Sequence, residues 1–146
     1  MTNLSDPIYT DADAAREHLE SLRWPDGPYC PHCGELEQIT KLQGKSTRPG
    51  VYKCRSCRKP FSVTVGTLFE RSHIPLNKWL LAVHLLSASK KGMSAHQLHR
   101  MLGVQYKSAW FVAHRIREAM RPGSKGPLGG SGAPVEVDET YFGKRE

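Results

Sequence analysis

Four cysteines of this 146-residue sequence stand in two C-x2-C pairs separated by twenty residues: Cys30, Cys33, Cys54 and Cys57. Each pair brings two thiolates close enough to share one metal ion, and four thiolates complete the tetrahedron that zinc prefers. Because such coordination is saturated, the ion would hold the fold together and leave no open position for catalysis. The spacing therefore predicts a structural Zn²⁺ site with these four ligands.

Two other interpretations of these cysteines stay open: an iron site for electron transfer and a redox-active dithiol. An iron carrier would gain nothing from the basic helices that follow, and a dithiol enzyme would carry one C-x2-C beside a βαβ pattern. His32 lies inside the first pair and is superfluous as a ligand. Around the second pair, four basic residues offset the negative charge of the thiolates: Lys53, Arg55, Arg58 and Lys59. The second pair is therefore a candidate phosphate-facing surface.

The net charge of +7 conceals three blocks of different sign. Residues 1–40 hold two basic and eight acidic side chains, residues 41–125 hold seventeen and two, and residues 126–146 hold two and four. A block as basic as residues 41–125 repels itself unless a polyanion neutralises it, and DNA is the commonest polyanion for such a surface. RNA, an anionic lipid surface and a solubilising face are the alternatives.

Apolar periodicity outlines the elements that must position these residues. We expect an amphipathic helix over residues 11–22, followed by short β-like runs at 38–42, 51–54 and 61–65. A second helix opens at Pro75. The apolar stripe expected to face the core of that helix consists of Leu76, Trp79, Leu80, Val83 and Leu86.

A helix-turn-helix is predicted further along the chain. Ser94 with Gln97 gives a capping-box pattern, and Gly103 is a natural left-handed stop before a longer basic helix. In such a motif the first residues of the second helix meet base edges, and basic residues further on lie along phosphates. The predicted DNA-binding residues are Gln105, Tyr106, Lys107, Ser108, Arg115, Arg117 and Arg121. A plain three-helix bundle with a solvated basic side is the alternative.

The expected architecture is a small multi-domain α+β chain. Residues 1–70 form a helix plus a zinc ribbon of short antiparallel strands, and residues 71–122 form the three-helix helix-turn-helix unit. Residues 123–134 are rich in glycine and proline and read as a flexible linker. Residues 135–146 begin an incomplete strand. No apolar run approaches the roughly 18 residues that span a bilayer, and the acidic N-terminus is unlike a secretory signal, so we expect a cytoplasmic protein without membrane contact.

The sequence resembles bacterial insertion-sequence transposases in four stretches, which are residues 22–33, 61–69, 75–82 and 135–141. That family combines an N-terminal transposase zinc ribbon, a helix-turn-helix and a DDE catalytic domain of RNase H-like fold. The resemblance implies that Asp138 is the first carboxylate of the catalytic metal-binding set. It also implies Mg²⁺ as the cofactor of an intact catalytic domain, where several acidic ligands hold two ions for phosphoryl transfer.

The sequence ends eight residues after Asp138, before the later Asp and Glu of the family. We therefore expect a truncated N-terminal part that recognises double-stranded DNA at the terminal inverted repeats of its element, without catalysis by this chain alone. Self-association into a homo-oligomer stays open. Two alternatives are a non-catalytic DNA-binding repressor of the element and a zinc-ribbon module that binds protein.

Overall fold

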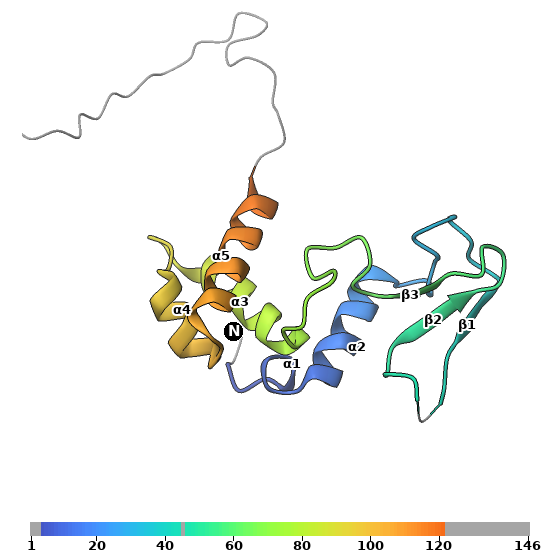
Figure 1. Ribbon diagram of the computed structural model, residues 1–146, viewed down its shortest axis with the longest axis horizontal. Coiled ribbons are helices and arrows are strands. Elements are labelled where there is room, and N and C mark those ends of the chain that lie inside the picture. The colour runs from blue at the N-terminus through green and yellow to red at the C-terminus, as the bar shows by residue number, and fades with distance from the viewer. Residues whose placement is uncertain (1–3, 45, 122–146) are drawn as a thin grey trace, which may run out of the picture.

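The computed structural model describes residues 4–44 and 46–121. Within them the chain runs through two helices, a three-stranded sheet and three further helices. The helices are α1 (Pro7–Thr10), α2 (Ala12–Arg23), α3 (Leu76–Ala88), α4 (Ala95–Leu102) and α5 (Tyr106–Met120), and the strands are β1 (Ile39–Lys41), β2 (Val51–Cys54) and β3 (Pro60–Ser62). Figure 1 shows α3, α4 and α5 at one end, the sheet at the other and α2 between them. The α+β class is confirmed.

The N-terminal helices begin where aspartates can cap them. Asp11 accepts a hydrogen bond from the Asp13 N–H (3.1 Å) at the start of α2, as the pattern of residues 11–22 predicts. The short helix α1 was not predicted. It begins after Asp6, which accepts from the Ile8 N–H (3.2 Å), with Pro7 in the first turn.

The sheet is an antiparallel meander with β2 in the centre. Ile39 pairs with Cys54 in one ladder, and Val51 pairs with Ser62 in the other. The predicted third run, residues 61–65, extends too far, because β3 ends at Ser62. There the chain turns back, since the Val65 N–H donates to the Ser62 carbonyl (3.1 Å), and the ladder cannot continue.

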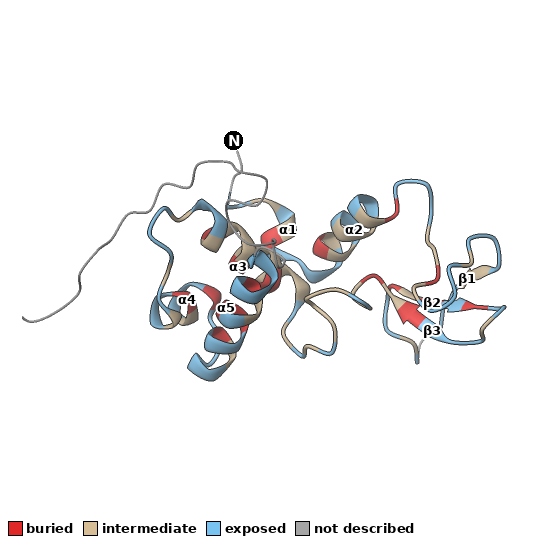
Figure 2. Cartoon of the chain, turned by 90° about the horizontal axis from the view of Figure 1, so that it is seen from above, coloured by how far each residue is buried: buried red, intermediate tan, exposed pale blue. Residues whose placement is uncertain are grey.

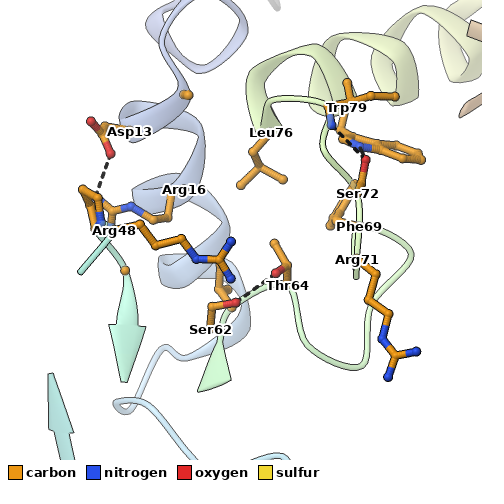
Figure 3. Close-up of a pocket in the computed structure, with 15 residues that line it drawn as sticks. Asp13, Arg16, Arg48, Ser62, Thr64, Phe69, Arg71, Ser72, Leu76 and Trp79 are labelled. Atoms are coloured by element: carbon orange, nitrogen blue, oxygen red, sulfur yellow. Dashed lines mark hydrogen bonds and ion pairs between the residues drawn. The ribbon is translucent and has the colours of Figure 1, made fainter. Parts of the chain in front are cut away.

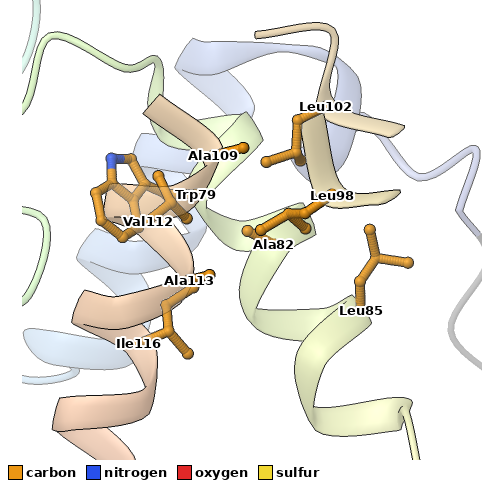
Figure 4. Packing of buried hydrophobic residues seen from close by; sticks show 9 residues of the cluster. All are labelled: Trp79, Ala82, Leu85, Leu98, Leu102, Ala109, Val112, Ala113 and Ile116. Carbon is orange, nitrogen blue, oxygen red and sulfur yellow. The ribbon is translucent and has the colours of Figure 1, made fainter. Parts of the chain in front are cut away.

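Two hydrophobic clusters hold the described residues together. The ribbon cluster surrounds Trp24, which meets Tyr52 and Phe61 edge-on at centroid distances of 5.3 and 5.9 Å. The helical cluster, shown in Figure 4, is made by α3, α4 and α5. Its buried members are Trp79, Ala82, Leu85, Leu98, Leu102, Ala109, Val112, Ala113 and Ile116.

The buried line of α3 differs from the predicted stripe. Of the five predicted positions only Trp79 is fully buried, and Ala82 and Leu85 complete the buried set. The reason is that α3 is covered on more than one side. Tyr9 of α1 lies against His84 (5.4 Å between ring centroids), while α4 and α5 pack on the other side, so no single exposed face remains. Figure 2 shows buried positions on these helices as well as on the strands.

The segment between the sheet and α3 links the ribbon to the helices. Arg23 Nη1, at the end of α2, donates to the carbonyls of Val63 (2.5 Å) and Val65 (2.6 Å) just beyond β3. Further along, the Trp79 indole N–H donates to Ser72 Oγ (2.9 Å), which ties the loop to α3. Figure 3 shows the crevice that α2, the ribbon and this loop line together. Within the described residues no helix is long and apolar enough to cross a bilayer.

Candidate metal centre and nucleic-acid interface

The four cysteines converge as the spacing predicts. All four Sγ atoms lie within 4.8 Å of one another, and the Cys30–Cys57 and Cys33–Cys54 sulfur pairs are each 3.6 Å apart. These separations exceed a disulfide bond of about 2.05 Å. They match the edge of about 3.8 Å that a tetrahedron with Zn–S bonds of about 2.3 Å requires. The donor set therefore fits one four-coordinate zinc ion.

Both cysteine turns use the same backbone device. The Cys30 N–H donates to the Glu35 carbonyl (2.9 Å), and the Cys54 N–H donates to the Lys59 carbonyl (3.1 Å). Four residues after the first cysteine of each turn, the chain enters the left-handed region, with φ of 78° at Gly34 and 61° at Arg58. Glycine takes this conformation freely, whereas arginine pays about 1 kcal/mol or more. The second turn is thus held in place by its surroundings despite its residue type.

The electrostatics of the turn favour a thiolate at Cys30. Burial opposes ionisation, but hydrogen bonds from the backbone of His32 and Cys33 and from neighbouring thiols lower the Cys30 pKa to about 7. At Cys33 the backbone of Glu35 favours the thiolate, but the Cys30 sulfur and burial raise the pKa to about 12. The first thiolate therefore forms near neutral pH, and thiolate is the form that binds metal.

Four basic residues lie beside the second cysteine pair in sequence. Lys53, Arg55, Arg58 and Lys59 are all exposed. Arg55 Nε donates to Thr40 Oγ1 (3.0 Å) on β1. The Ser56 hydroxyl, in the second cysteine turn, donates to Glu35 Oε2 (2.9 Å), just after the first turn, and so joins the two cysteine turns. His32 is exposed, and the four cysteines supply all four ligands of a tetrahedral site without it.

The second candidate site is the junction of α4 and α5. Ser94 accepts a hydrogen bond from the Gln97 N–H (3.2 Å) and begins α4, and Gly103 ends it in the left-handed conformation (φ 60°, ψ 39°). The Gly103 N–H donates to the His99 carbonyl (3.0 Å), and α5 starts three residues later. The predicted start and stop signals are therefore confirmed, although the helix-turn-helix function assigned to them stays a prediction.

The predicted base-contacting residues lie together at the start of α5. Gln105 is the N-cap residue and makes no side-chain capping bond, and Tyr106 and Lys107 are exposed beside it. Ser108 is half-buried. The first three side chains are therefore available to a ligand that approaches the N-terminal end of α5.

The three arginines expected along phosphates each have an intramolecular partner. Arg115 Nη1 donates to the Glu70 carbonyl (3.0 Å), and Arg117 Nη2 donates to the Met93 carbonyl (2.9 Å). Arg121 pairs with the Glu118 carboxylate at 3.3 Å on the surface. Two of these residues thus also fasten α5 to neighbouring loops. Asp138, the 123–134 linker and the 135–146 strand lie outside the described residues.

Sequence reasoning missed the exposed position of Trp110 on the outer side of α5. Trp110 and Phe111 are 49% and 44% exposed, although tryptophan and phenylalanine read as core residues in a pattern search. The buried positions Ala109, Ala113 and Ile116 define the inner face. A helical wheel built on these three would have placed Trp110 and Phe111 outside it.

Comparison with known proteins bears on the ribbon first. The model of the transposase zinc-ribbon domain matches residues 10–60, which contain α2, the four cysteines and the first two strands. The chain is related to insertion-sequence transposases.

A second comparison reaches further along the chain. An uncharacterized protein in the transposable element ISH50 of Halobacterium salinarum is 33% identical over 126 residues, which cover 84% of this chain. The chain spans 39% of the length of that curated relative. No solved structure gives a significant match to this transposase-related chain. The relationship therefore covers the helical region as well as the ribbon.

Proposed function

We propose that this chain is the DNA-binding portion of an insertion-sequence transposase, in which the zinc ribbon and the α4–α5 unit recognise the ends of the element. The observation that carries the proposal is the exposed polar start of α5, which follows the left-handed Gly103 at the end of α4. In a helix-turn-helix, the second helix presents its N-terminal residues to base edges. Gln105 and Lys107 are chemically suited to adenine and guanine.

Charge supports duplex DNA as the partner. Residues 76–121 carry eight basic side chains and one acidic side chain, Glu118. Lys90, Lys91 and Arg100 are exposed within this region. Such a surface would displace counterions from DNA, which makes affinity fall steeply as salt rises. On this proposal Arg115, Arg117 and Arg121 lie near phosphates and share their remaining N–H groups between the protein and DNA.

The ribbon's part in this proposal is structural and electrostatic. A zinc ion held by Cys30, Cys33, Cys54 and Cys57 would fix both cysteine turns, because the ribbon cluster is too small to be stable alone. The exposed basic residues of the second turn would then follow a phosphate backbone. Asp138 enters the proposal only through the family resemblance, as the first ligand of a Mg²⁺ pair whose other carboxylates would lie elsewhere in an intact catalytic domain.

The test is a binding measurement on the full chain with duplex DNA from the ends of its element, at several salt concentrations. Lys107→Ala should weaken binding at least fivefold, because base contacts contribute about 1–3 kcal/mol each. Arg48→Ala is the charge-matched control, since Arg48 is exposed between β1 and β2, away from α5, and should change affinity less than twofold.

Equal losses in the two variants would mean that net charge alone governs binding, and the assignment of α5 would fail. Salt-insensitive binding of a protein partner with no duplex affinity would favour the interaction module instead. Adding Mg²⁺ distinguishes catalysis by this chain from DNA binding without catalysis. Nicking at the element ends would show catalysis by this chain, whereas a footprint without nicking fits a DNA-binding role.

A further inference from the structure

The outward face of α5 carries three large side chains that stay largely exposed. Tyr106, Trp110 and Phe111 are 41%, 49% and 44% exposed. Together with Lys107 they line one shallow depression that is almost entirely apolar. The inner face of the helix is already complete, since Ala109 and Ile116 are buried against α3 and α4. The exposed parts of the aromatic rings are therefore open to a partner.

Neighbouring rings hold each of these side chains in place. His96 of α4 stacks on Tyr106, with centroids 4.3 Å apart and planes at 26°. His114 lies 4.1 Å from Trp110 one turn along α5, and Phe111 meets the buried Trp79 edge-on at 6.4 Å. Side chains that are positioned in this way lose little conformational entropy when a ligand covers them. The depression is thus a preformed feature of the surface.

The charge around the depression indicates what would cover it. Its one charged lining residue is Lys107, and residues 76–121 have eight basic residues against one acidic residue. A polyanion that also displays isolated apolar groups fits this combination. Duplex DNA does so in the major groove, where the 5-methyl group of thymine is the apolar feature among the hydrogen-bonding edges of the bases.

We propose that the depression lined by Tyr106, Trp110 and Phe111 receives thymine 5-methyl groups in the major groove. The inference rests on the proposed function, because α5 must enter the groove for these rings to reach bases. Gln105, one residue before Tyr106, is then placed to bond adenine, while Lys107 favours a flanking guanine. The α5 contact site therefore contains A·T pairs read partly through their methyl groups.

The experiment compares thymine with uracil, which lacks only the methyl group. Duplexes that the full chain selects from a randomised pool are synthesised with thymidine and, separately, with deoxyuridine at each thymine in turn. Removing one buried methyl should weaken binding about fourfold, at one or two positions rather than throughout the site. Affinity at the other positions should change less than twofold.

Two variants connect this difference to α5. Trp110→Ala and Tyr106→Ala should lower affinity for the thymidine duplex and reduce the thymidine-to-deoxyuridine ratio toward one. Met120→Ala is the matched control, because Met120 is 51% exposed on the same helix but lies outside the depression, and it should keep the full ratio. Circular dichroism of each variant checks that the helices are intact.

Three results would overturn the inference while leaving duplex recognition intact. They are a selected site without enriched thymine, a ratio near one in the unsubstituted chain, and a ratio that persists in both aromatic variants. If Trp110→Ala instead dissociates an oligomer and leaves the ratio unchanged, the face is an interface between copies and the inference also fails. Absence of salt-sensitive duplex binding by the unsubstituted chain would refute the proposed function itself.

Discussion

The Tyr52 hydroxyl donates a hydrogen bond to Glu20 Oε2 (3.1 Å), which joins the central strand of the ribbon to α2. The other oxygen of the same carboxylate accepts from Arg16 Nη1 (3.0 Å), and the Glu20 side chain is only 15% exposed. A half-buried carboxylate that loses one partner pays part of its desolvation cost. Tyr52→Phe should therefore lower the free energy of unfolding by about 1–3 kcal/mol at pH 7, as measured by urea denaturation.

The surroundings of Tyr52 also predict that the stability of the chain depends on pH. Burial, followed by the charge of Glu20 and the hydrogen bond to it, raises the pKa of Tyr52 in the folded chain. The unfolded tyrosine ionises near pH 10. The stabilisation is therefore complete below about pH 10 and is lost as pH rises from there through the folded pKa. Between pH 8 and a pH above 10, the urea midpoint of the unsubstituted chain should fall more than that of Tyr52→Phe. Equal falls in the two proteins would contradict this.

Zinc removal should act on the ribbon before the helical cluster. The ribbon cluster includes Cys30 and Cys54 themselves, whereas the helical cluster contains no cysteine among its described members. We expect one zinc per chain by elemental analysis. Chelation should change the fluorescence of the buried Trp24 while most of the helical circular dichroism persists. Cys33→Ser should lose zinc, and His32→Ala, in the same turn, should retain it; loss of zinc from both would place His32 among the ligands.

Substitutions at two glycines with nearly the same φ should distinguish destabilisation by backbone strain from destabilisation by steric crowding. Gly50 and Gly92 have φ of 77° and 79°. A Cβ at Gly92 would meet no atom within 4 Å, whereas at Gly50 it would collide with the Arg16 side chain. Gly92→Ala should cost about 1 kcal/mol of stability through conformation alone. Gly50→Ala should cost more, because Arg16 must move away from Glu20. Equal thermal shifts in the two variants would show that Arg16 adjusts freely.

Replacing Arg115 and replacing Arg121 should change the free energy of unfolding by different amounts, although both residues were predicted to meet phosphates. Arg115 is half-buried and bonds the Glu70 carbonyl, so Arg115→Ala should lower the free energy of unfolding by about 1–3 kcal/mol. Arg121 forms an exposed pair with Glu118, whose side chains are 73% and 70% exposed, so Arg121→Ala should change it by less than about 1 kcal/mol. Urea denaturation without DNA measures both, and similar losses would contradict the anchoring role of Arg115.

Local chemistry accounts for what the sequence by itself determined. The cysteine spacing predicted that the four sulfurs meet, because a C-x2-C turn brings its two sulfurs together whatever surrounds it. Ser94 and Gly103 marked the ends of α4 correctly, since a cap depends on residues within one turn of it. These features are set by neighbours along the chain, so a reading of short windows was sufficient.

Only the tertiary structure decided which surfaces are shared between elements. The buried line of α3 moved to Ala82 and Leu85 because helices cover it on more than one side, and β3 ended at Ser62 because the chain turns back there. The bond from Tyr52 to Glu20 and the exposed position of Trp110 depend on residues far apart in sequence or on which face of α5 meets the core. Such relationships arise from packing in three dimensions, which no local pattern specifies.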